Sequence, residues 1–283
     1  MNKALVEASA GSLGALFACL VLFPLDVAKT KHQASTDKTE KKKTTLTIVK
    51  KIYDEEGIAG LFVGLGPKAA HTVLQNFFYF YWYSWLKALY EKTRGPLTTT
   101  ANLSIGALAG AINMTITLPL DVVSTRIQTS DASTSTVELV HQLYKEDGLL
   151  SFWKGYIPSL VLVTNPSIFY TIFDRLKLRV ARELSAMEAF VLAAIAKSIA
   201  TIVTYPIIRA KVIMQAEKSK TSSGSMVQVL DRIWQQDGVA GFFQGCNAQL
   251  LNTVFKSALL LMTKEQIGQL TVRLLYPLQQ RKS

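Results

Sequence analysis

The segment FPLDVAKTKHQ (Phe23–Gln33) decides the fold, because closely related segments occur twice more in the chain. These are LPLDVVSTRIQ (Leu118–Gln128) and YPIIRAKVIMQ (Tyr205–Gln215). Each one places a proline and charged residues at the end of a long apolar run and finishes on a glutamine. Recurrence of one motif at a similar place in successive stretches of sequence indicates a repeat architecture.

A second motif follows each proline segment. A short amphipathic pattern leads to an acid–glycine pair, then to two bulky apolar residues and another glycine. The glycines of the acid–glycine pairs are Gly57, Gly148 and Gly238, which lie 91 and 90 residues apart. Each is expected to end the short helix in the left-handed conformation that glycine adopts easily. The period divides the chain into three repeats, expected at residues 1–95, 96–182 and 183–283.

The composition favours a membrane protein, since 49% of the residues are hydrophobic, only 18% are charged, and the mean hydropathy is +0.23. A membrane-crossing helix needs roughly 20 residues, and six stretches qualify. Each also contains small and polar residues, which indicates helices packed around a polar interior. We therefore expect an all-α protein with six transmembrane helices, and in every repeat a short amphipathic helix on the membrane surface. A large soluble helical protein is the alternative. The six expected spans are residues 5–28, 68–90, 101–123, 157–180, 187–210 and 247–271.

The net charge of +11 has two interpretations: basic loops of a membrane protein, or a positive field that gathers anionic substrates. Nucleic-acid binding is disfavoured, because the basic residues are scattered over three loops. Cys19 and Cys246 lie in apolar contexts and predict no disulfide framework. No catalytic motif and no metal-spaced Cys or His is present, and the chain has three histidines, so neither an enzyme nor a metal site is expected.

The three motif prolines are expected to bend the helices at the ends of the apolar runs. Pro24, Pro119 and Pro206 each remove one backbone hydrogen bond and are expected to bend the odd-numbered spans. Three such bends would draw those spans together beneath a cavity. Charged residues that follow each proline could then meet around a ring, in a partly dry constriction where ion pairs gain more than at the surface.

The proline motif, the acid–glycine pairs and the ninety-residue period resemble those of the mitochondrial carrier family, over essentially the whole chain. The resemblance implies a six-helix bundle with three-fold pseudo-symmetry around a central cavity. It also implies transport by alternating access between two gates of charged residues. In that family each motif acid pairs with the motif base of the next odd-numbered span.

By this pairing the first gate is incomplete, because Ser124 stands at one base position and Ile208 at one acid position. Only the pair of Asp121 with Lys211 is intact, so a weak gate is expected, with Arg126 substituting for the missing base. The alternative is that these charges merely mark the membrane boundary. The residues expected at this gate are Asp26, Lys29, Asp121, Arg126, Arg209 and Lys211. The motif of the opposite gate is even less complete, and its expected residues are Asp174, Lys177 and Glu265.

Several stretches, including LVTNPSIFYTIFDRLK (Leu162–Lys177), resemble the peroxisomal adenine nucleotide carriers of that family, the plant type most closely. The resemblance implies exchange of ATP for ADP or AMP across the peroxisomal membrane, supplying ATP for fatty-acid activation. Alternatives are transport of NAD, coenzyme A or FAD, a mitochondrial inner-membrane location, and a scaffold without transport. Expected partners are nucleotides and membrane lipid, with no nucleic acid and no cofactor, and the chain is expected to be a monomer.

The resemblance also implies where a nucleotide would bind, about seven residues after the glycine that opens each even-numbered span. Leu162 and Val163 would form an apolar adenine slot. Lys256, one helical turn beyond Asn252, would bind phosphate in place of a lysine that this branch carries at that position. Lys197 is a charge inside an apolar span, and it either faces the cavity or snorkels from the interior. The predicted substrate-binding residues are His71, Thr72, Leu162, Val163, Lys197, Asn252, Thr253 and Lys256; His71 is alternatively a satisfied polar residue of the bundle.

Overall fold

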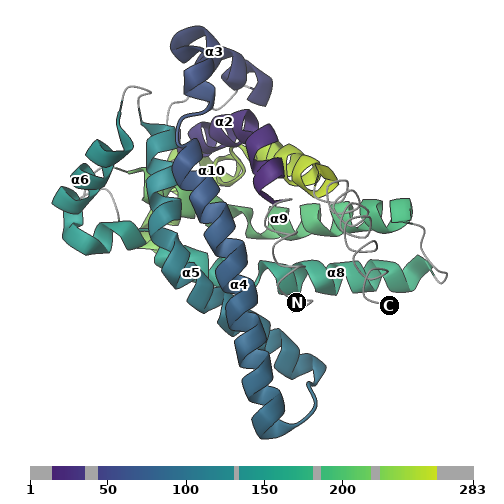
Figure 1. Cartoon of the computed structure of the whole chain (residues 1–283). Helices are drawn as coiled ribbons and strands as arrows, with labels where there is room; N and C mark the ends of the chain where they lie inside the picture. The colour runs from purple at the N-terminus through teal and green to yellow at the C-terminus, as the bar shows by residue number, and fades with distance from the viewer. Residues whose placement is uncertain (1–14, 36–43, 131–133, 181–185, 218–223, 260–283) are drawn as a thin grey trace, which may run out of the picture.

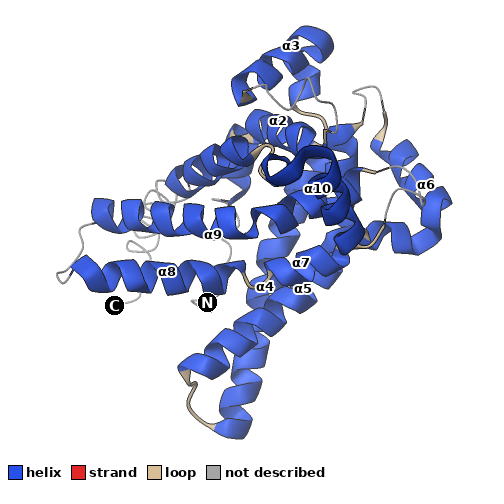
Figure 2. Cartoon of the chain, turned by 180° about the vertical axis from the view of Figure 1, so that it is seen from behind, coloured by secondary structure: helices blue, strands red, loops and turns tan. Residues whose placement is uncertain are grey.

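The structure, a computed structural model, describes residues 15–35, 44–130, 134–180, 186–217 and 224–259 (Figure 1). These residues form helices joined by turns and short loops, and no strand occurs among them (Figure 2). The expected all-α class is therefore confirmed.

The three repeats follow one another along the chain as similar sets of helices. The first contains α2 (Phe23–Ala34), α3 (Thr45–Leu61) and α4 (Leu65–Arg94). The second contains α5 (Thr99–Thr129), α6 (Thr136–Asp147), the 3-10 helix η2 (Gly148–Trp153), α7 (Tyr156–Leu162) and α8 (Asn165–Val180). The third contains α9 (Ala186–Ala216), α10 (Met226–Phe242) and a helix of residues 246–259.

Within the described residues, three segments have the length and apolar composition to cross a membrane: Thr100–Thr129, Thr136–Val180 and Met187–Ala216. They contain the third, fourth and fifth expected spans. The first and sixth expected spans extend into residues outside the described part. The second lies within α4, which is long enough but is not among the three. Polar residues of α4, among them Lys68 and His71, approach Asp121 of α5. These polar side chains of α4 therefore face the interior of the bundle.

The helices α2, α5 and α9 each contact the other two. Away from this junction the chain forms two antiparallel hairpins, α4 with α5 and α8 with α9, which diverge from one another (Figure 1). The short helices α3, α6 and α10 lie around the junction end of the molecule, as both views show.

Three separate apolar clusters fix each short helix to the proline-motif helix of its own repeat. The same two positions of each short helix enter its cluster: Ile48 and Ile52 against α2, Leu139 and Leu143 against α5, and Val229 and Ile233 against α9. These six side chains are 0–4% exposed, and burial of an aliphatic side chain contributes about 1.5–3 kcal/mol. The apolar packing is thus three-fold repeated.

The motif prolines differ in their local setting. Pro24 stands at the start of α2, just after Leu22 interrupts a preceding helical stretch with φ −97° and ψ 8°. Pro119 and Pro206 lie inside α5 and α9, which continue through them. The bending role of the three prolines stays a prediction.

The glycines of the acid–glycine pairs have positive φ, but the expected left-handed helical cap is wrong. Gly57, Gly148 and Gly238 have φ of 60–68° with ψ between −164° and −143°. Essentially only glycine adopts this region. The chain kinks at these glycines and continues into another helical turn. The left-handed helical conformation belongs to the glycines that open the next helices, Gly64 (φ 80°, ψ 13°) and Gly155 (φ 77°, ψ 19°).

Gly148→Ala is expected to destabilise the protein by about 1–3 kcal/mol, because a side chain strains this backbone conformation. A Cβ at this position would meet no atom within 4 Å, so the cost is conformational and not steric. The matched control is Gly66→Ala inside α4, where the surroundings are equally open and alanine favours the helix. Thermal unfolding of the purified protein in detergent compares them, and equal melting temperatures would contradict the assignment.

Candidate functional site

Asp121 of α5 is the centre of one polar cluster at the junction. Lys211 Nζ of α9 lies 2.8 Å from its Oδ2, and Lys68 Nζ of α4 lies 3.2 Å from its Oδ1. His71 Nε2 is 3.9 Å from the same Oδ1, and the Gln215 amide donates to Oδ2 at 3.2 Å. Asp121 is only 7% exposed. One buried carboxylate therefore joins three helices from three repeats.

Asp26 of α2 is the centre of a second cluster. Its Oδ1 accepts from Lys29 Nζ at 2.7 Å, from Asn252 Nδ2 at 2.7 Å and from Lys256 Nζ at 3.3 Å. Asp26 is 1% exposed and Asn252 is 2% exposed. The other carboxylate oxygen, Oδ2, is buried and has no hydrogen-bond partner in the described part of the chain. Asn252 and Lys256 thus connect the third repeat to the first.

The motif glutamines form further links between repeats. Gln33 donates to the Tyr205 hydroxyl at 3.0 Å, and Gln215 accepts from the Thr125 hydroxyl at 3.0 Å. The third, Gln128, is buried, and its Nε2 has no hydrogen-bond partner among the described residues. The sequence pattern shows these glutamines, but their pairing depends on contacts across repeats.

Two buried arginines expected at the first gate serve other contacts. Arg126 donates to Glu146 at the end of α6 and to the Ala216 carbonyl oxygen at 2.7 Å. The expected substitution of Arg126 for the missing base beside Asp26 is therefore wrong in this conformation. Arg209 donates to the Gln244 side chain and to the Gly241 carbonyl oxygen. Both guanidinium groups fasten odd-numbered spans to neighbouring segments at the junction.

The expected opposite gate is not closed by any described pair. Asp174 and Lys177 of α8 are exposed, and neither forms an ion pair with another described residue. Glu265 lies outside the described residues. Among the described residues, the ion pairs that join different repeats lie at the proline-motif end, which they close, and the two hairpins in Figure 1 diverge away from that end.

The predicted substrate residues divide among several places. His71 adjoins Asp121, whereas Asn252 and Lys256 adjoin Asp26. The hydroxyls of Thr72 and Thr253 donate to carbonyls of their own helices. The apolar pair stands where α7 ends and α8 has not begun, and Val163 packs against α5: a Cβ on Gly110 would lie 3.2 Å from Val163 Cγ1.

Lys197 contacts α8. Its Nζ donates to Asn165 Oδ1 at 2.8 Å and lies 5.8 Å from the centre of the Phe169 ring, a cation–π distance. Asn165 also donates to the Thr204 hydroxyl at 2.8 Å. Sequence reasoning missed Asn165 and Phe169, although the Asn165–Pro166 step inside a span was a signal. It also missed Lys68, which the sequence could have indicated because it is a charged residue at the start of the second expected span.

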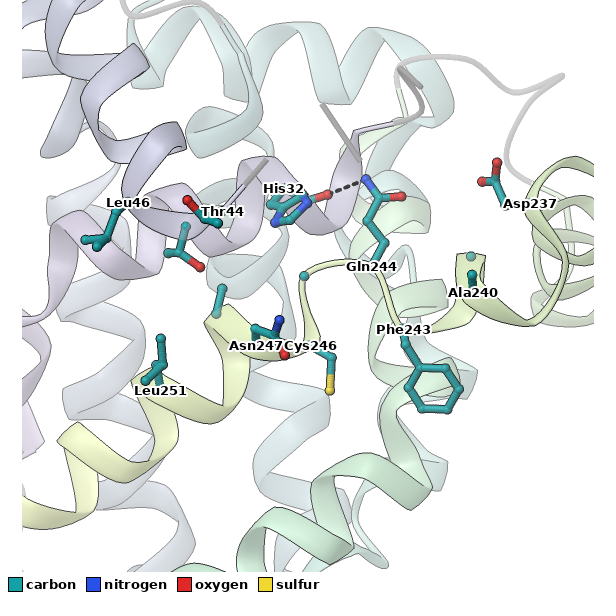
Figure 3. Close-up of a pocket in the computed structure, with 14 residues that line it drawn as sticks. His32, Thr44, Leu46, Asp237, Ala240, Phe243, Gln244, Cys246, Asn247 and Leu251 are labelled. Atoms are coloured by element: carbon teal, nitrogen blue, oxygen red, sulfur yellow. Dashed lines mark hydrogen bonds between the residues drawn. The ribbon is translucent and has the colours of Figure 1, made fainter. Parts of the chain in front are cut away.

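A cavity of about 680 Å³ lies between the end of α2, the start of α3 and the turn after α10 (Figure 3). Its wall includes His32 and Gln244, and the Gln244 amide donates to the His32 carbonyl oxygen at 2.9 Å. None of the predicted substrate residues lines it, so we assign it no part in substrate binding. In the described part of the chain, no three His, Cys, Asp or Glu side chains gather closely enough to hold a metal ion.

Asp121→Asn is expected to destabilise the closed conformation by about 3–5 kcal/mol, because it leaves partly buried cations without their carboxylate. Asp174→Asn is the matched control, since that carboxylate is exposed and has no ion-pair partner in the described residues. The melting temperature in detergent should fall for the first variant and stay within about one degree for the second. Similar shifts for both would show that the cluster does not hold the junction.

Sequence comparison with known proteins finds similar carriers over nearly the whole chain. The chain is 41% identical over 95% of its length to the peroxisomal adenine nucleotide carrier 1 of Glycine max, covering 92% of that protein. It is 31% identical to the peroxisomal adenine nucleotide transporter 1 of Saccharomyces cerevisiae, over 96% of this chain and 94% of the other. A peroxisomal nicotinamide adenine dinucleotide carrier of Arabidopsis thaliana is 29% identical, over 94% of this chain and 96% of the other.

The mitochondrial carrier protein family matches the chain three times, over residues 2–94, 95–184 and 182–274. This confirms the three-repeat organisation and the resemblance found in the sequence. The six-helix architecture of the carriers accounts for the helices described above together with the spans that extend outside the described part. The chain belongs to the mitochondrial carrier protein family.

Proposed function

We propose that the chain exchanges ATP for ADP or AMP across the peroxisomal membrane by alternating access. One observation carries the proposal: in the two described clusters, four lysine ammonium groups surround two carboxylates. The clusters are therefore cationic, and charge-assisted hydrogen bonds from ammonium groups are suited to phosphate. The lysines are Lys29, Lys68, Lys211 and Lys256.

Exposure of these lysines supports their availability to a substrate. The side chains of Lys68 and Lys211 are each 21% exposed and that of Lys256 is 32% exposed, whereas Asp26 and Asp121 are nearly buried. These three lysine side chains are therefore more accessible than the carboxylates that they contact, and Lys29 is less exposed at 14%. A phosphate that approaches from the open side would meet the lysines first.

An apolar wall suits the base of the nucleotide. Leu162 ends α7 and Val163 follows it in the turn before α8, where Val163 packs beside Gly110 of α5. Adenine binds well in a flat apolar slot with a few polar groups at its edge. Lys197, held by Asn165, would be available to a phosphate or to a ring edge as the substrate moves.

In the proposed cycle the ion pairs of the junction break when the substrate is bound and re-form when the carrier closes. The three repeats of one chain surround the site, so the proposal needs one protomer and no cofactor. Its biological role would be to supply ATP for fatty-acid activation inside peroxisomes. Several relatives that carry peroxisomal adenine nucleotide names support both the substrate and the location.

Transport of NAD is a second candidate, because one relative of similar coverage is named a peroxisomal NAD carrier. NAD also contains adenine and two phosphates, so the clusters described above would suit it as well. The two substrates differ in the terminal phosphates of ATP, which would meet the lysines.

Purified protein reconstituted in liposomes tests the proposal. Uptake of radiolabelled ATP is expected to be saturable and to require internal ADP or AMP. Exchange of NAD without ATP uptake would favour the second candidate. Absence of exchange with any nucleotide, NAD, coenzyme A or FAD would indicate a scaffold.

Lys256→Gln is expected to lower kcat/KM for ATP about tenfold or more and that for AMP less, because a triphosphate uses more cationic contacts. Lys145→Gln is the control, since it removes an exposed lysine of α6 away from both clusters. Initial rates of ATP and AMP uptake measure the difference. Equal losses for both nucleotides would argue against phosphate contact by Lys256.

A further inference from the structure

We infer that Asp26 occupies the phosphate-binding side chains of the empty carrier, so that Lys256 and Asn252 alternate between this carboxylate and a substrate phosphate. The inference rests on the proposed function and deepens it, because it assigns one pair of residues to both substrate binding and gate closure. It also predicts which junction between repeats receives the phosphates.

The contacts that carry the inference cross from the third repeat to the first. Asn252 Nδ2 and Lys256 Nζ lie one helical turn apart on the helix of residues 246–259, and both donate to Asp26 Oδ1. Lys29, the third donor, belongs to the same helix as Asp26. Asn252 and Lys256 therefore supply the described contacts that tie this carboxylate to another repeat.

The reason for this arrangement is a missing base. The position on α5 that would carry the partner of Asp26 is Ser124, which is 1% exposed and whose hydroxyl has no hydrogen-bond partner among the described residues. A buried carboxylate requires a compensating cation, and Lys29 of the same helix already lies 2.7 Å from Asp26 Oδ1. Lys256 adds a second cation at 3.3 Å, the one that comes from another repeat, and it comes from the even-numbered span instead of the odd-numbered one. The lysine proposed to bind phosphate is therefore also part of the closure.

The three repeats show a matching pattern of polarity. The position seven residues after the opening glycine is His71, Leu162 or Asn252, and the acid position of the next repeat is Asp121, Ile208 or Asp26. His71 adjoins Asp121 and Asn252 adjoins Asp26, whereas the remaining combination is apolar at both positions. The phosphates are therefore assigned to the two junctions that involve the first repeat, and the base to the junction of the second and third.

This exchange of partners couples binding to opening. A phosphate that attracts Lys256 and Asn252 would leave Lys29 as the described donor to Asp26 Oδ1. The other carboxylate oxygen, Oδ2, has no partner among the described residues even before this change. Asp26 would keep the Lys29 ammonium, but the closed state would lose the described contacts of this carboxylate with the third repeat, so its free energy would rise relative to the open state. A triphosphate competes for Lys256 more strongly than a monophosphate.

A double-mutant cycle without nucleotide tests the contact itself. Thermal unfolding in detergent is measured for the wild type, Asp26→Asn, Lys256→Gln and the double variant. The melting temperature of the double variant is expected to be no lower than that of the more destabilised single variant, because both singles break the same pair. Strictly additive decreases would overturn the inference, whatever the protein transports.

Nucleotide binding to the full-length protein tests the competition. Asp26→Asn is expected to tighten the Kd for ATP about tenfold and to slow ATP/AMP exchange in liposomes, since the competing charge and its coupling are both removed. Glu91→Gln, an equivalent change at an exposed site of α4, should leave both values unchanged. Wild type that binds ATP while Asp26→Asn binds it no more tightly would overturn the inference alone. Wild type that binds no nucleotide would overturn the proposed function.

Discussion

The closed end of this protein depends on compensating two buried carboxylates. Asp26 and Asp121 lie in the helices that converge at the junction, and each would be costly in that position without cations. One cation, Lys29, belongs to the same helix as Asp26, and the others come from other helices: Lys211 from α9, Lys68 from α4 and Lys256 from the terminal described helix. Convergence of the helices and pairing of the charges therefore require one another, and under the proposal a ligand that competes for the cations would act directly on the closure.

Apolar packing and polar contacts have different symmetries. In each repeat the same two positions of the short helix pack against the proline-motif helix, so the apolar packing is three-fold. The polar ring is not three-fold, because Ser124 and Ile208 stand where a base and an acid would complete it. A nucleotide is itself asymmetric, with phosphates at one end and a base at the other. An apolar junction beside two polar ones fits such a substrate better than a symmetric ring would.

Much of the fold could be predicted, because helical period, glycine spacing and the proline motif are local patterns. The pairing of Asp121 with Lys211 was implied by the resemblance to the carrier family, and these two side chains do meet in the structure. The prediction that Arg126 substitutes for the missing base beside Asp26 was wrong, because Arg126 contacts Glu146 and that contact depends on where α6 ends in space. Asn165 and Phe169 were missed, since nothing local shows that they lie beside Lys197 on the neighbouring helix.

The sequence by itself determined the three repeats, the helical class and the positions at which charges interrupt apolar spans, because these follow from the spacing and composition of its residues. Its motifs also carry the resemblance that implied the family. Only the tertiary structure decided which donors reach which carboxylate. Asn252 is 226 residues from Asp26 along the chain and donates to it at 2.7 Å. The physical reason is that hydrogen bonds and ion pairs need direct contact within a few ångströms, and contact between repeats is set by how the helices pack.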